Sequence, residues 1–376
     1  MDYDKLIAPA AKAMRPSGIR KFFDLAAEMP ECISLGVGEP DFKTPWAVRE
    51  AGIESLEHGR TRYTSNAGLK ELRAEISRYL ERRMNLRYDP MRQILVTVGG
   101  SEAIDMCIRT LVKPGDEVII PEPCFVCYEP ITTLSGGVPV HVACRQEDEF
   151  RLRADALKAA ITPRTKLVIM PFPNNPTGAL YPKEVLQQIV DIAREHQLII
   201  FSDEIYDRLV MDGLQHISIA SMAPDLFCVT FSGLSKSHMI AGYRIGWMIL
   251  SGNKRIAKDY IEGLNMLANM RMCSNVPAQS VVQTALGGHQ SVNDYIVPGG
   301  RLYEQREYIY NALNSIPGVT AVKPKAAFYI FPKLDVKKFN ITDDEQFALD
   351  LLHDKRILIT RGGGFNWHEP DPFRIV

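Results

Sequence analysis

Short apolar runs alternate with amphipathic stretches through the middle of the sequence, and this alternation limits the folds open to the chain. The runs QILVTV, EVIIP and KLVIMPFP, which begin at Gln93, Glu117 and Lys166, are rich in β-branched residues. Segments with helical periodicity stand between such runs, for example KEVLQQIVDIAREH from Lys183. Apolar strands separated by helices predict a mostly parallel sheet with helices on both faces. The predicted fold class is therefore α/β.

Four further runs of the same kind bring the predicted sheet to seven strands: VPVHVA, LIIFSD, FCVTFS and IGWMIL. They place a large domain at residues 46–285. Beyond it, RLYEQREYIYNALNSI and DEQFALDLLHD predict helices, whereas AAFYIF and RILIT predict strands. This pattern is typical of a smaller α+β domain, formed by residues 286–376 and completed by residues 1–45.

Charge and cysteine usage exclude several classes of protein. The 44 basic and 45 acidic residues give a net charge of -1, so neither a nucleic acid nor an anionic membrane is expected as a partner. No apolar run approaches the roughly 18 residues of a membrane span, and the first residues do not resemble a signal peptide. Seven cysteines, an odd number, favour free thiols in a cytoplasmic protein. The pair Cys124 and Cys127 lacks a second pair at zinc-finger spacing, so no metal site is predicted.

The first candidate site is the turn that follows LVTV. There GGSEA places two glycines before Ser101, which opens a predicted helix. Backbone N–H groups at a helix N-terminus, with a hydroxyl beside them, suit an anion such as phosphate. The turn matches neither the dinucleotide fingerprint nor the P-loop, so those two classes lose support.

Three other strand ends carry polar groups of different chemistry. NNPTG presents the amide of Asn175, SDEIY presents Asp203 and Tyr206, and FCVTFS leads to Lys236 among small residues, with Arg244 eight positions later. Because ligands of open α/β sheets bind beyond the carboxyl ends of the strands, these groups are expected to meet in one site.

The segments PNNPTG, SDEIY and SGLSKSHMIAGYRIGW, in this order, resemble fold type I pyridoxal-phosphate enzymes, specifically the class I/II aminotransferases. The likeness extends to ISLGVGEPDFKTP, YTSNAGLKELR and PKAAFYIF, and so covers essentially the whole chain. The resemblance implies a pyridoxal 5'-phosphate cofactor and a homodimer with shared active sites. It also implies a ping-pong transfer of an amino group from an amino acid to a 2-oxo acid.

The resemblance assigns a role to each residue that matches a motif of the family. Lys236 corresponds to the lysine that binds the cofactor covalently and then carries a proton at the substrate's α-carbon. Asp203 corresponds to the acid beside the pyridine nitrogen. Asn175 and Tyr206 correspond to the pair that bonds the ring's phenolic oxygen, and Phe125 to the aromatic that stacks on the ring.

The same resemblance implies a phosphate site and a contribution from a second subunit. Arg244 supplies a bidentate charge, and Ser101 with the amides of Gly100 and Glu102 forms the cradle at the helix terminus. Tyr63 corresponds to the tyrosine that reaches across from the second subunit.

A serine stands three residues before the lysine in many relatives, but this chain has Gly233 there. Ser232 and Ser235 are therefore both kept as candidates for the phosphate.

For the substrate, Arg374 corresponds to the arginine that pairs with the α-carboxylate, with the backbone of Gly38 and the amide of Asn175 close by. His238 is read as a structural residue, because the family uses the lysine itself as the base. Candidates for contacting a substrate side chain are Arg109, Arg271 and Ser274.

SGIRKFF and YTSNAGLKELR resemble the bacterial aspartate and aromatic aminotransferase branch, so aspartate with 2-oxoglutarate is the favoured substrate pair. An aromatic or N-acyl-diaminopimelate aminotransferase stays an alternative. A carbon–sulfur β-lyase on the same fold is a further alternative, which would release pyruvate and ammonia without an acceptor. A non-enzymatic regulator is disfavoured, because the likeness begins so near Met1 that it leaves no space for a DNA-binding domain.

Overall fold

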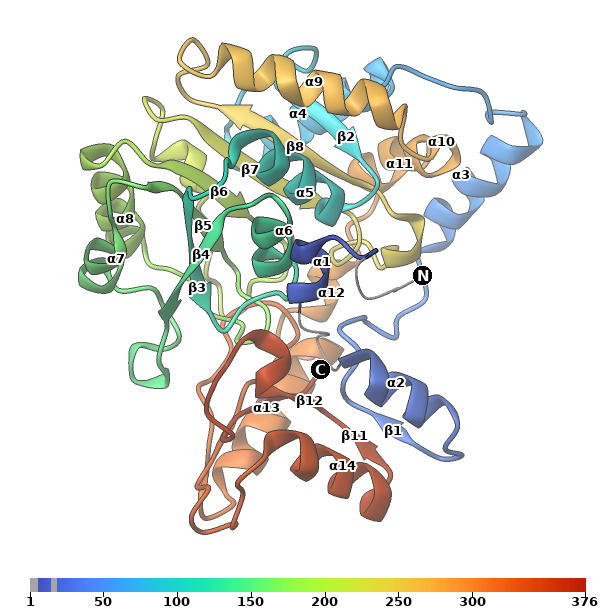
Figure 1. Cartoon of the computed structure of the whole chain (residues 1–376). Coiled ribbons are helices and arrows are strands. Elements are labelled where there is room, and N and C mark those ends of the chain that lie inside the picture. The colour runs from blue at the N-terminus through green and yellow to red at the C-terminus, as the bar shows by residue number, and fades with distance from the viewer. Residues whose placement is uncertain (1–5, 15–18) are drawn as a thin grey trace.

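A seven-stranded sheet forms the centre of the molecule, with its strands in the order β2-β8-β7-β6-β5-β3-β4 (Figure 1). The computed structural model describes residues 6–14 and 19–376, so the first two residues of SGIRKFF lie outside the described part. The strands are β2 (Ile94–Thr97), β3 (Glu117–Glu122), β4 (Val138–Ala143), β5 (Thr165–Pro171), β6 (Ile199–Asp203), β7 (Cys228–Gly233) and β8 (Gly246–Ser251). The α/β class and the seven strands predicted from the sequence are confirmed.

Most neighbouring strands of this sheet are parallel, as predicted. β8 is antiparallel to both of its neighbours, β2 and β7. The strand β3 is buried on both faces of the sheet, because Val118 and Ile120 pack into one hydrophobic cluster and Ile119 packs into another on the opposite face. This explains why the strand sequences are continuously apolar instead of alternating between apolar and polar residues.

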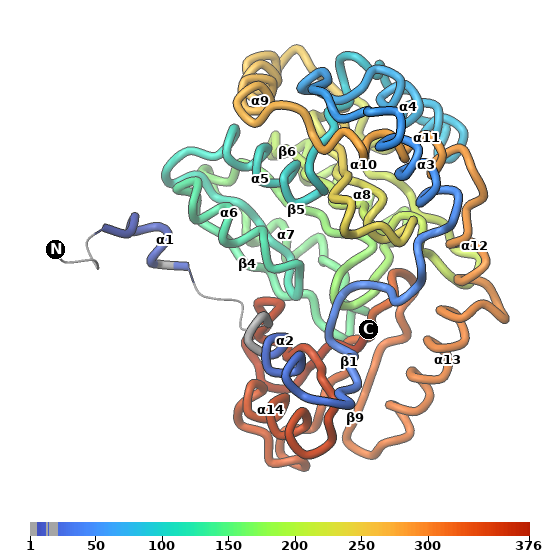
Figure 2. The backbone as a smooth tube through the Cα atoms, turned by 90° about the vertical axis from the view of Figure 1, so that its right-hand side faces the viewer, coloured from blue at the N-terminus to red at the C-terminus, as the bar shows by residue number. Residues whose placement is uncertain are grey.

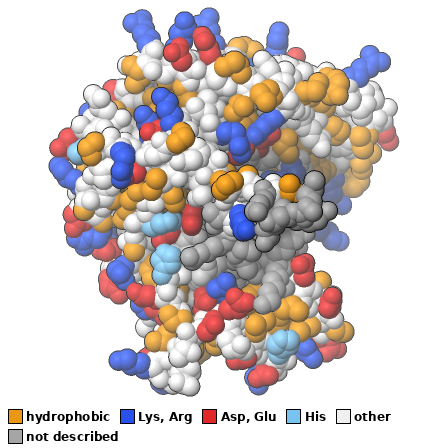
Figure 3. All heavy atoms as spheres, viewed as in Figure 1, with side chains coloured by type: hydrophobic (Ala, Val, Ile, Leu, Met, Phe, Trp, Pro, Cys, Tyr) orange, Lys and Arg blue, Asp and Glu red, His pale blue; other side chains and the backbone are white. Residues whose placement is uncertain are grey.

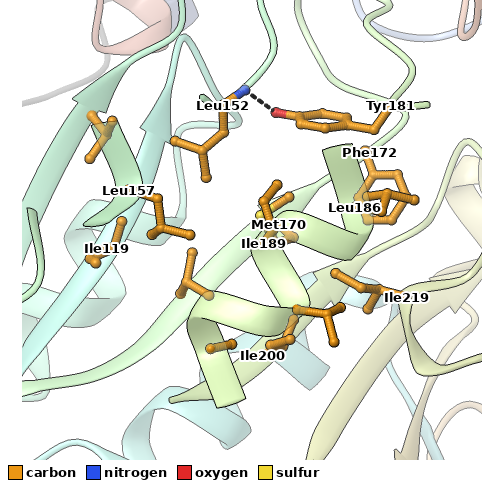
Figure 4. Packing of buried hydrophobic residues seen from close by; sticks show 14 of the residues in the cluster. Ile119, Leu152, Leu157, Met170, Phe172, Tyr181, Leu186, Ile189, Ile200 and Ile219 are labelled. Carbon is orange, nitrogen blue, oxygen red and sulfur yellow. Dashed lines mark hydrogen bonds between the residues drawn. The ribbon is translucent and has the colours of Figure 1, made fainter. Parts of the chain in front are cut away.

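Helices cover both faces of the sheet (Figure 1). They are α3 (Trp46–Glu57), α4 (Lys70–Met84), α5 (Gly100–Leu111), α6 (Tyr128–Leu134), α7 (Ala154–Ala160), α8 (Lys183–Glu195), α9 (Lys258–Arg271), α10 (Val276–Ser280) and α11 (Val282–Gly287). Figure 4 shows one of the clusters between a helix and the sheet, in which Leu186 and Ile189 of α8 lie close to Met170 of β5. These side chains are fully buried, and their burial is the main force that fixes α8 against the sheet.

The segment with α2 and β1 packs against the C-terminal elements below the sheet, as Figure 2 shows for α2, β1 and α14. The elements of these two parts are α2 (Ile19–Ala27), β1 (Ile33–Ser34), α13 (Arg301–Asn314), β9 (Val319–Thr320), β10 (Lys333–Leu334), α14 (Asp344–Lys355), β11 (Ile357–Leu358), β12 (Thr360–Arg361) and β13 (Phe373–Arg374). β1 pairs in parallel with β11, and Phe22, Leu352 and Leu358 share one hydrophobic cluster. The division into residues 46–285 and a domain made from 1–45 and 286–376 stays a prediction. Two short helices, α1 (Pro9–Ala13) and α12 (Val292–Tyr295), complete the α-helices of the described residues.

The structure corrects two predictions for the smaller domain. AAFYIF is not a strand, since only isolated bridges link Ala326 to Val210 and Ile330 to Ile375. The reason is a left-handed turn at Ala327, whose φ of 59° no strand residue adopts. RILIT is divided into the short strands β11 and β12.

The surface seen in Figure 3 carries acidic and basic side chains interspersed with one another, in keeping with the near-zero net charge. Within residues 6–14 and 19–376, no helix is both long and apolar enough to cross a membrane.

Candidate active site

A cavity of about 640 Å³ opens at the carboxyl ends of β5, β6 and β7, beside the start of α5. It brings together residues that lie far apart in the sequence. Of the residues predicted for the site, its lining contains Gly38, Gly100, Ser101, Phe125, Asn175, Asp203, Tyr206, Ser235, Lys236, Arg244 and Arg374. The topological rule that collects strand ends at one edge of a sheet therefore located the cavity.

Three of the predicted residues do not line this cavity. Ser232 lines a separate small cavity together with Glu204 and Thr230, so it is not placed to bind the phosphate. Ser235 lines the large cavity and remains the candidate. The carboxylate of Glu102 accepts a hydrogen bond of 2.6 Å from the backbone N–H of Val98, which leaves only its own amide for an anion. Tyr63 is 79% exposed.

The anion end of the cavity is built by the first turn of α5. Its N-cap residue Gly99 has a φ of 78° and offers no capping side chain, so the first amides of the helix are left for a ligand. A Cβ placed on Gly100 would meet nothing within 4 Å, which shows open space above the turn. Arg244, itself left-handed at φ 52°, brings its guanidinium beside Gly99. Helix terminus, hydroxyl and guanidinium together fit a phosphate group.

Asp203 ends β6 and lies buried beneath the centre of the cavity. The hydroxyl of Tyr128 donates a 2.7 Å hydrogen bond to its Oδ2, and the N–H of Ile205 donates to Oδ1 at 3.3 Å. Burial raises the pKa of Asp203, while the Tyr128 bond acts in the opposite direction. A buried carboxylate of this kind fits a ligand group that carries a proton and a positive charge, since such a group favours its ionised form.

Lys236 follows β7 and reaches back across the cavity, where its Nζ donates a 2.7 Å hydrogen bond to the carbonyl of Gly38. Desolvation by burial, followed by the nearby charge of Arg374, lowers the pKa of Lys236 to about 8. The amine therefore reaches its neutral, nucleophilic form much closer to neutral pH than an exposed lysine does.

Arg374 in β13 is only 4% exposed. Its guanidinium lies between two aromatic rings, 4.7 Å from the centre of Tyr329 and 4.6 Å from that of Phe365. Nη1 donates to Oδ1 of Asn175 at 2.9 Å and Nη2 to the carbonyl of Gly36 at 2.6 Å, while Nε is buried without a partner among the described residues. A rigid, buried cation in the wall of a cavity is well suited to a carboxylate.

Two tyrosines of the site were missed by the sequence analysis. Tyr128 starts α6 and bonds Asp203, and Tyr329 stands 2.7 Å from Tyr206, hydroxyl to hydroxyl. Tyr329 belongs to the motif PKAAFYIF, which gave a signal for the family but none for this residue.

The residues considered for contacting a substrate side chain do not line the cavity. Arg109 and Arg271 both bond the carboxylate of Asp105, and Ser274 is buried and donates to the carbonyl of Thr97. His238 is also engaged, because its Nε2 bonds the carbonyl of Ala285 at 3.1 Å and burial lowers its pKa to about 4. These are the contacts of structural residues.

Comparisons with known proteins reveal extensive similarity. Residues 30–376 match the family described as aminotransferase class I and II. The glutamate-pyruvate aminotransferase AlaA of Haemophilus influenzae is 46% identical, over 94% of this chain and 87% of its own length. The solved structure of alanine aminotransferase from Pyrococcus furiosus has a TM-score of 0.93 at 34% identity and covers 98% of this chain and 94% of that one. The aspartate aminotransferase from Rhizobium meliloti has a TM-score of 0.88 at 28% identity, covering 98% and 93%.

A first prediction concerns the phosphate cradle. A Cβ on Gly246 would lie 2.5 Å from the backbone nitrogen of Gly100, so Gly246→Ala should displace the first turn of α5. We expect the affinity for pyridoxal phosphate, measured by titrating the cofactor-free protein, to fall by about tenfold or more. Gly287→Ala is the matched control, because a Cβ there meets nothing within 4 Å. Unchanged affinity in Gly246→Ala would contradict this description of the cradle.

A second prediction concerns the amine of Lys236. In the cofactor-free protein, the rate at which this amine captures pyridoxal phosphate should rise with pH around a midpoint near 8, because only the neutral amine reacts. The measurement is the initial rate of absorbance change at a series of pH values, with Lys236→Ala as the blank. A midpoint close to 10.5, the ordinary pKa of a lysine, would show that burial does not lower the pKa of the Lys236 amine.

Proposed function

This chain belongs to the class I and II aminotransferases, which use pyridoxal phosphate to move an amino group from an amino acid to a 2-oxo acid, and we propose that its preferred reaction is the exchange between glutamate and pyruvate that forms alanine. The observation that carries the proposal is the 46% identity with a glutamate-pyruvate aminotransferase over nearly the whole chain. The fold neighbour from Pyrococcus furiosus, an alanine aminotransferase, supports the same pair.

The residues of the cavity suit each step of such a transfer. Arg374, with the amide of Asn175 and the backbone around Gly38, holds the α-carboxylate that every substrate of the reaction shares. The neutral amine of Lys236 takes the proton from the substrate's α-carbon and returns it on the product side. When bound, the cofactor supplies the electron sink for the broken Cα–H bond. Asp203 holds the charge of the cofactor's ring nitrogen, because it is buried with no cationic side chain bonded to it among the described residues.

Aspartate, the donor favoured by the sequence motifs, stays the second candidate. The structural similarity to the aspartate aminotransferase from Rhizobium meliloti favours it, although the identity of 28% is well below that of the glutamate-pyruvate enzyme. Alanine and pyruvate require a single carboxylate site, which Arg374 provides. Aspartate and glutamate each carry a second carboxylate, so this group does not distinguish the two donors.

The proposal includes a homodimer that shares its active sites. Large apolar side chains stay exposed on α3 and α9, among them Trp46, Leu56 and Met270 at 57%, 57% and 79%. Tyr63, between α3 and α4, is equally exposed and does not line the cavity of its own chain. Large apolar side chains left exposed are in keeping with an interface, and Tyr63 would then complete the cavity of the second subunit. A cytoplasmic location, inferred from the cysteine content, remains part of the proposal.

The substrate pair can be tested by comparing donors on the purified, cofactor-loaded enzyme. We expect the kcat/KM for glutamate with pyruvate, and for alanine with 2-oxoglutarate, to exceed that for aspartate with 2-oxoglutarate by about tenfold or more. The donor half-reaction can be followed separately by the loss of the visible band. An aspartate value equal to or above the other two would reverse the assignment. Release of pyruvate and ammonia from a cysteine conjugate without an acceptor would instead indicate a β-lyase.

The shared site can be tested by mixing two inactive variants, Lys236→Ala and Tyr63→Ala. In a mixed dimer one site combines both defects and the other has neither, so random reassociation should restore about a quarter of the activity per subunit. If Tyr63 serves its own subunit, no intact site can form and the mixture should stay as inactive as its components.

A further inference from the structure

The hydroxyl of Tyr329 lies at the centre of a hydrogen-bond chain that crosses the cavity wall. It stands 2.7 Å from the hydroxyl of Tyr206 and 3.3 Å from the carbonyl of Gly38. The same carbonyl accepts the 2.7 Å hydrogen bond from Nζ of Lys236. Tyr206 and Tyr329 are 4% and 2% exposed, so bulk water does not compete for these bonds. The family resemblance gives roles to Tyr206 and Lys236 but leaves Tyr329 without one.

The hydrogen bonds among Tyr206, Tyr329 and the carbonyl of Gly38 allow two arrangements of the hydroxyl protons, because each phenol has one hydrogen and the carbonyl can only accept. If Tyr329 donates to Gly38, Tyr206 must donate to Tyr329, and its proton then points away from any ligand. If Tyr329 donates to Tyr206 instead, the proton of Tyr206 is free to point into the cavity.

The distances favour the second arrangement. The 3.3 Å contact between Tyr329 and Gly38 is longer than the roughly 2.5–3.0 Å of a good O–H···O bond. The 2.7 Å contact with Tyr206 is the shorter of the two, so the single hydroxyl proton of Tyr329 is better placed there than toward Gly38.

We propose that Tyr329 is a positioning residue that directs the hydroxyl proton of Tyr206 toward the bound cofactor. The inference rests on the cofactor being pyridoxal phosphate and on the role given above to Tyr206 at the phenolic oxygen. A phenol that accepts one hydrogen bond becomes a stronger donor in the next. A stronger donor stabilises negative charge on the phenolic oxygen, so the cofactor's visible absorption band titrates at a lower pH.

The ring of Tyr329 has a separate function. Its face lies 4.7 Å from the guanidinium of Arg374, which Phe365 covers from 4.6 Å. Phenylalanine at position 329 keeps this ring and removes only the hydroxyl. Tyr329→Phe therefore isolates the proposed effect, whereas Tyr329→Leu also removes the ring.

The test is a spectrophotometric pH titration of the cofactor-loaded enzyme in the absence of substrate. In Tyr329→Phe the midpoint of the visible band should rise by about 0.5 pH unit, since one neutral hydrogen bond acts through a second one. Tyr206→Phe should raise the midpoint further, and the double variant should match Tyr206→Phe alone. Tyr181→Phe is the matched control, because Tyr181 is also buried but does not line the cavity, and its hydroxyl accepts a hydrogen bond from the N–H of Leu152 (Figure 4).

Three results would overturn the proposal. A midpoint in Tyr329→Phe equal to that of the unaltered enzyme would show that the hydroxyl does not act on the cofactor. If Tyr329→Phe shifts the midpoint equally in the unaltered enzyme and in Tyr206→Phe, the hydroxyl of Tyr329 acts on the cofactor by a route other than Tyr206. A Tyr206→Phe variant with an unshifted midpoint would remove the role of Tyr206 and the proposal with it. The titration contains no amino acid, so its outcome is independent of whether glutamate, alanine or aspartate is the donor.

A kinetic readout separates the hydroxyl from the ring. Since the ring supports Arg374, the KM for the amino acid should rise more in Tyr329→Leu than in Tyr329→Phe. Equal increases in KM would indicate that the hydroxyl holds the carboxylate site, against the proposal.

Discussion

The buried guanidinium of Arg374 is the interaction on which the architecture of the cavity depends. Burial of a charge is strongly unfavourable unless aromatic faces and hydrogen bonds replace the lost water, and here both are present. The replacement groups are Tyr329, Phe365, the amide of Asn175 and the carbonyl of Gly36. They come from four separate stretches of the chain, so stabilising this one cation requires the smaller domain, the turn after β5 and the N-terminal segment to meet at one point.

The same low-polarity environment acts in opposite directions on the two ionisable groups at the centre. Burial raises the pKa of Asp203 and lowers that of Lys236, so each is biased toward its neutral form. Lys236 thereby gains a nucleophilic amine near neutral pH. A cationic partner would stabilise the charged form of Asp203, and the hydrogen bond from Tyr128 acts in the same direction. The electrostatics of the cavity therefore suit a ligand that brings a positively charged ring nitrogen to Asp203 and a group that reacts with the amine of Lys236.

Much of the site could be predicted because parallel strands deliver their ends to one edge of a sheet. Asn175, Asp203 and Lys236 lie at or just after the ends of β5, β6 and β7, so the positions of the strand ends in the sequence predicted that these residues share one cavity. Tyr128 and Tyr329 could not be found this way, since their partners lie 75 and 123 residues away in the sequence. The choice between Ser232 and Ser235 failed for a different reason. Ser232 is still part of β7 whereas Ser235 lies in the turn after it, and the sequence does not reveal at which residue the strand ends.

The pairing of β1 with β11 has a consequence for how the molecule is made on the ribosome. The last strand of the central sheet is β8, so its strands can associate while the segments that follow β8 are still being synthesised. The strand β1, although it precedes the whole sheet in the sequence, must wait until β11 has been synthesised before it finds its neighbour. The nascent chain therefore passes through a stage at which the anion end of the cavity is formed and its carboxylate end is not.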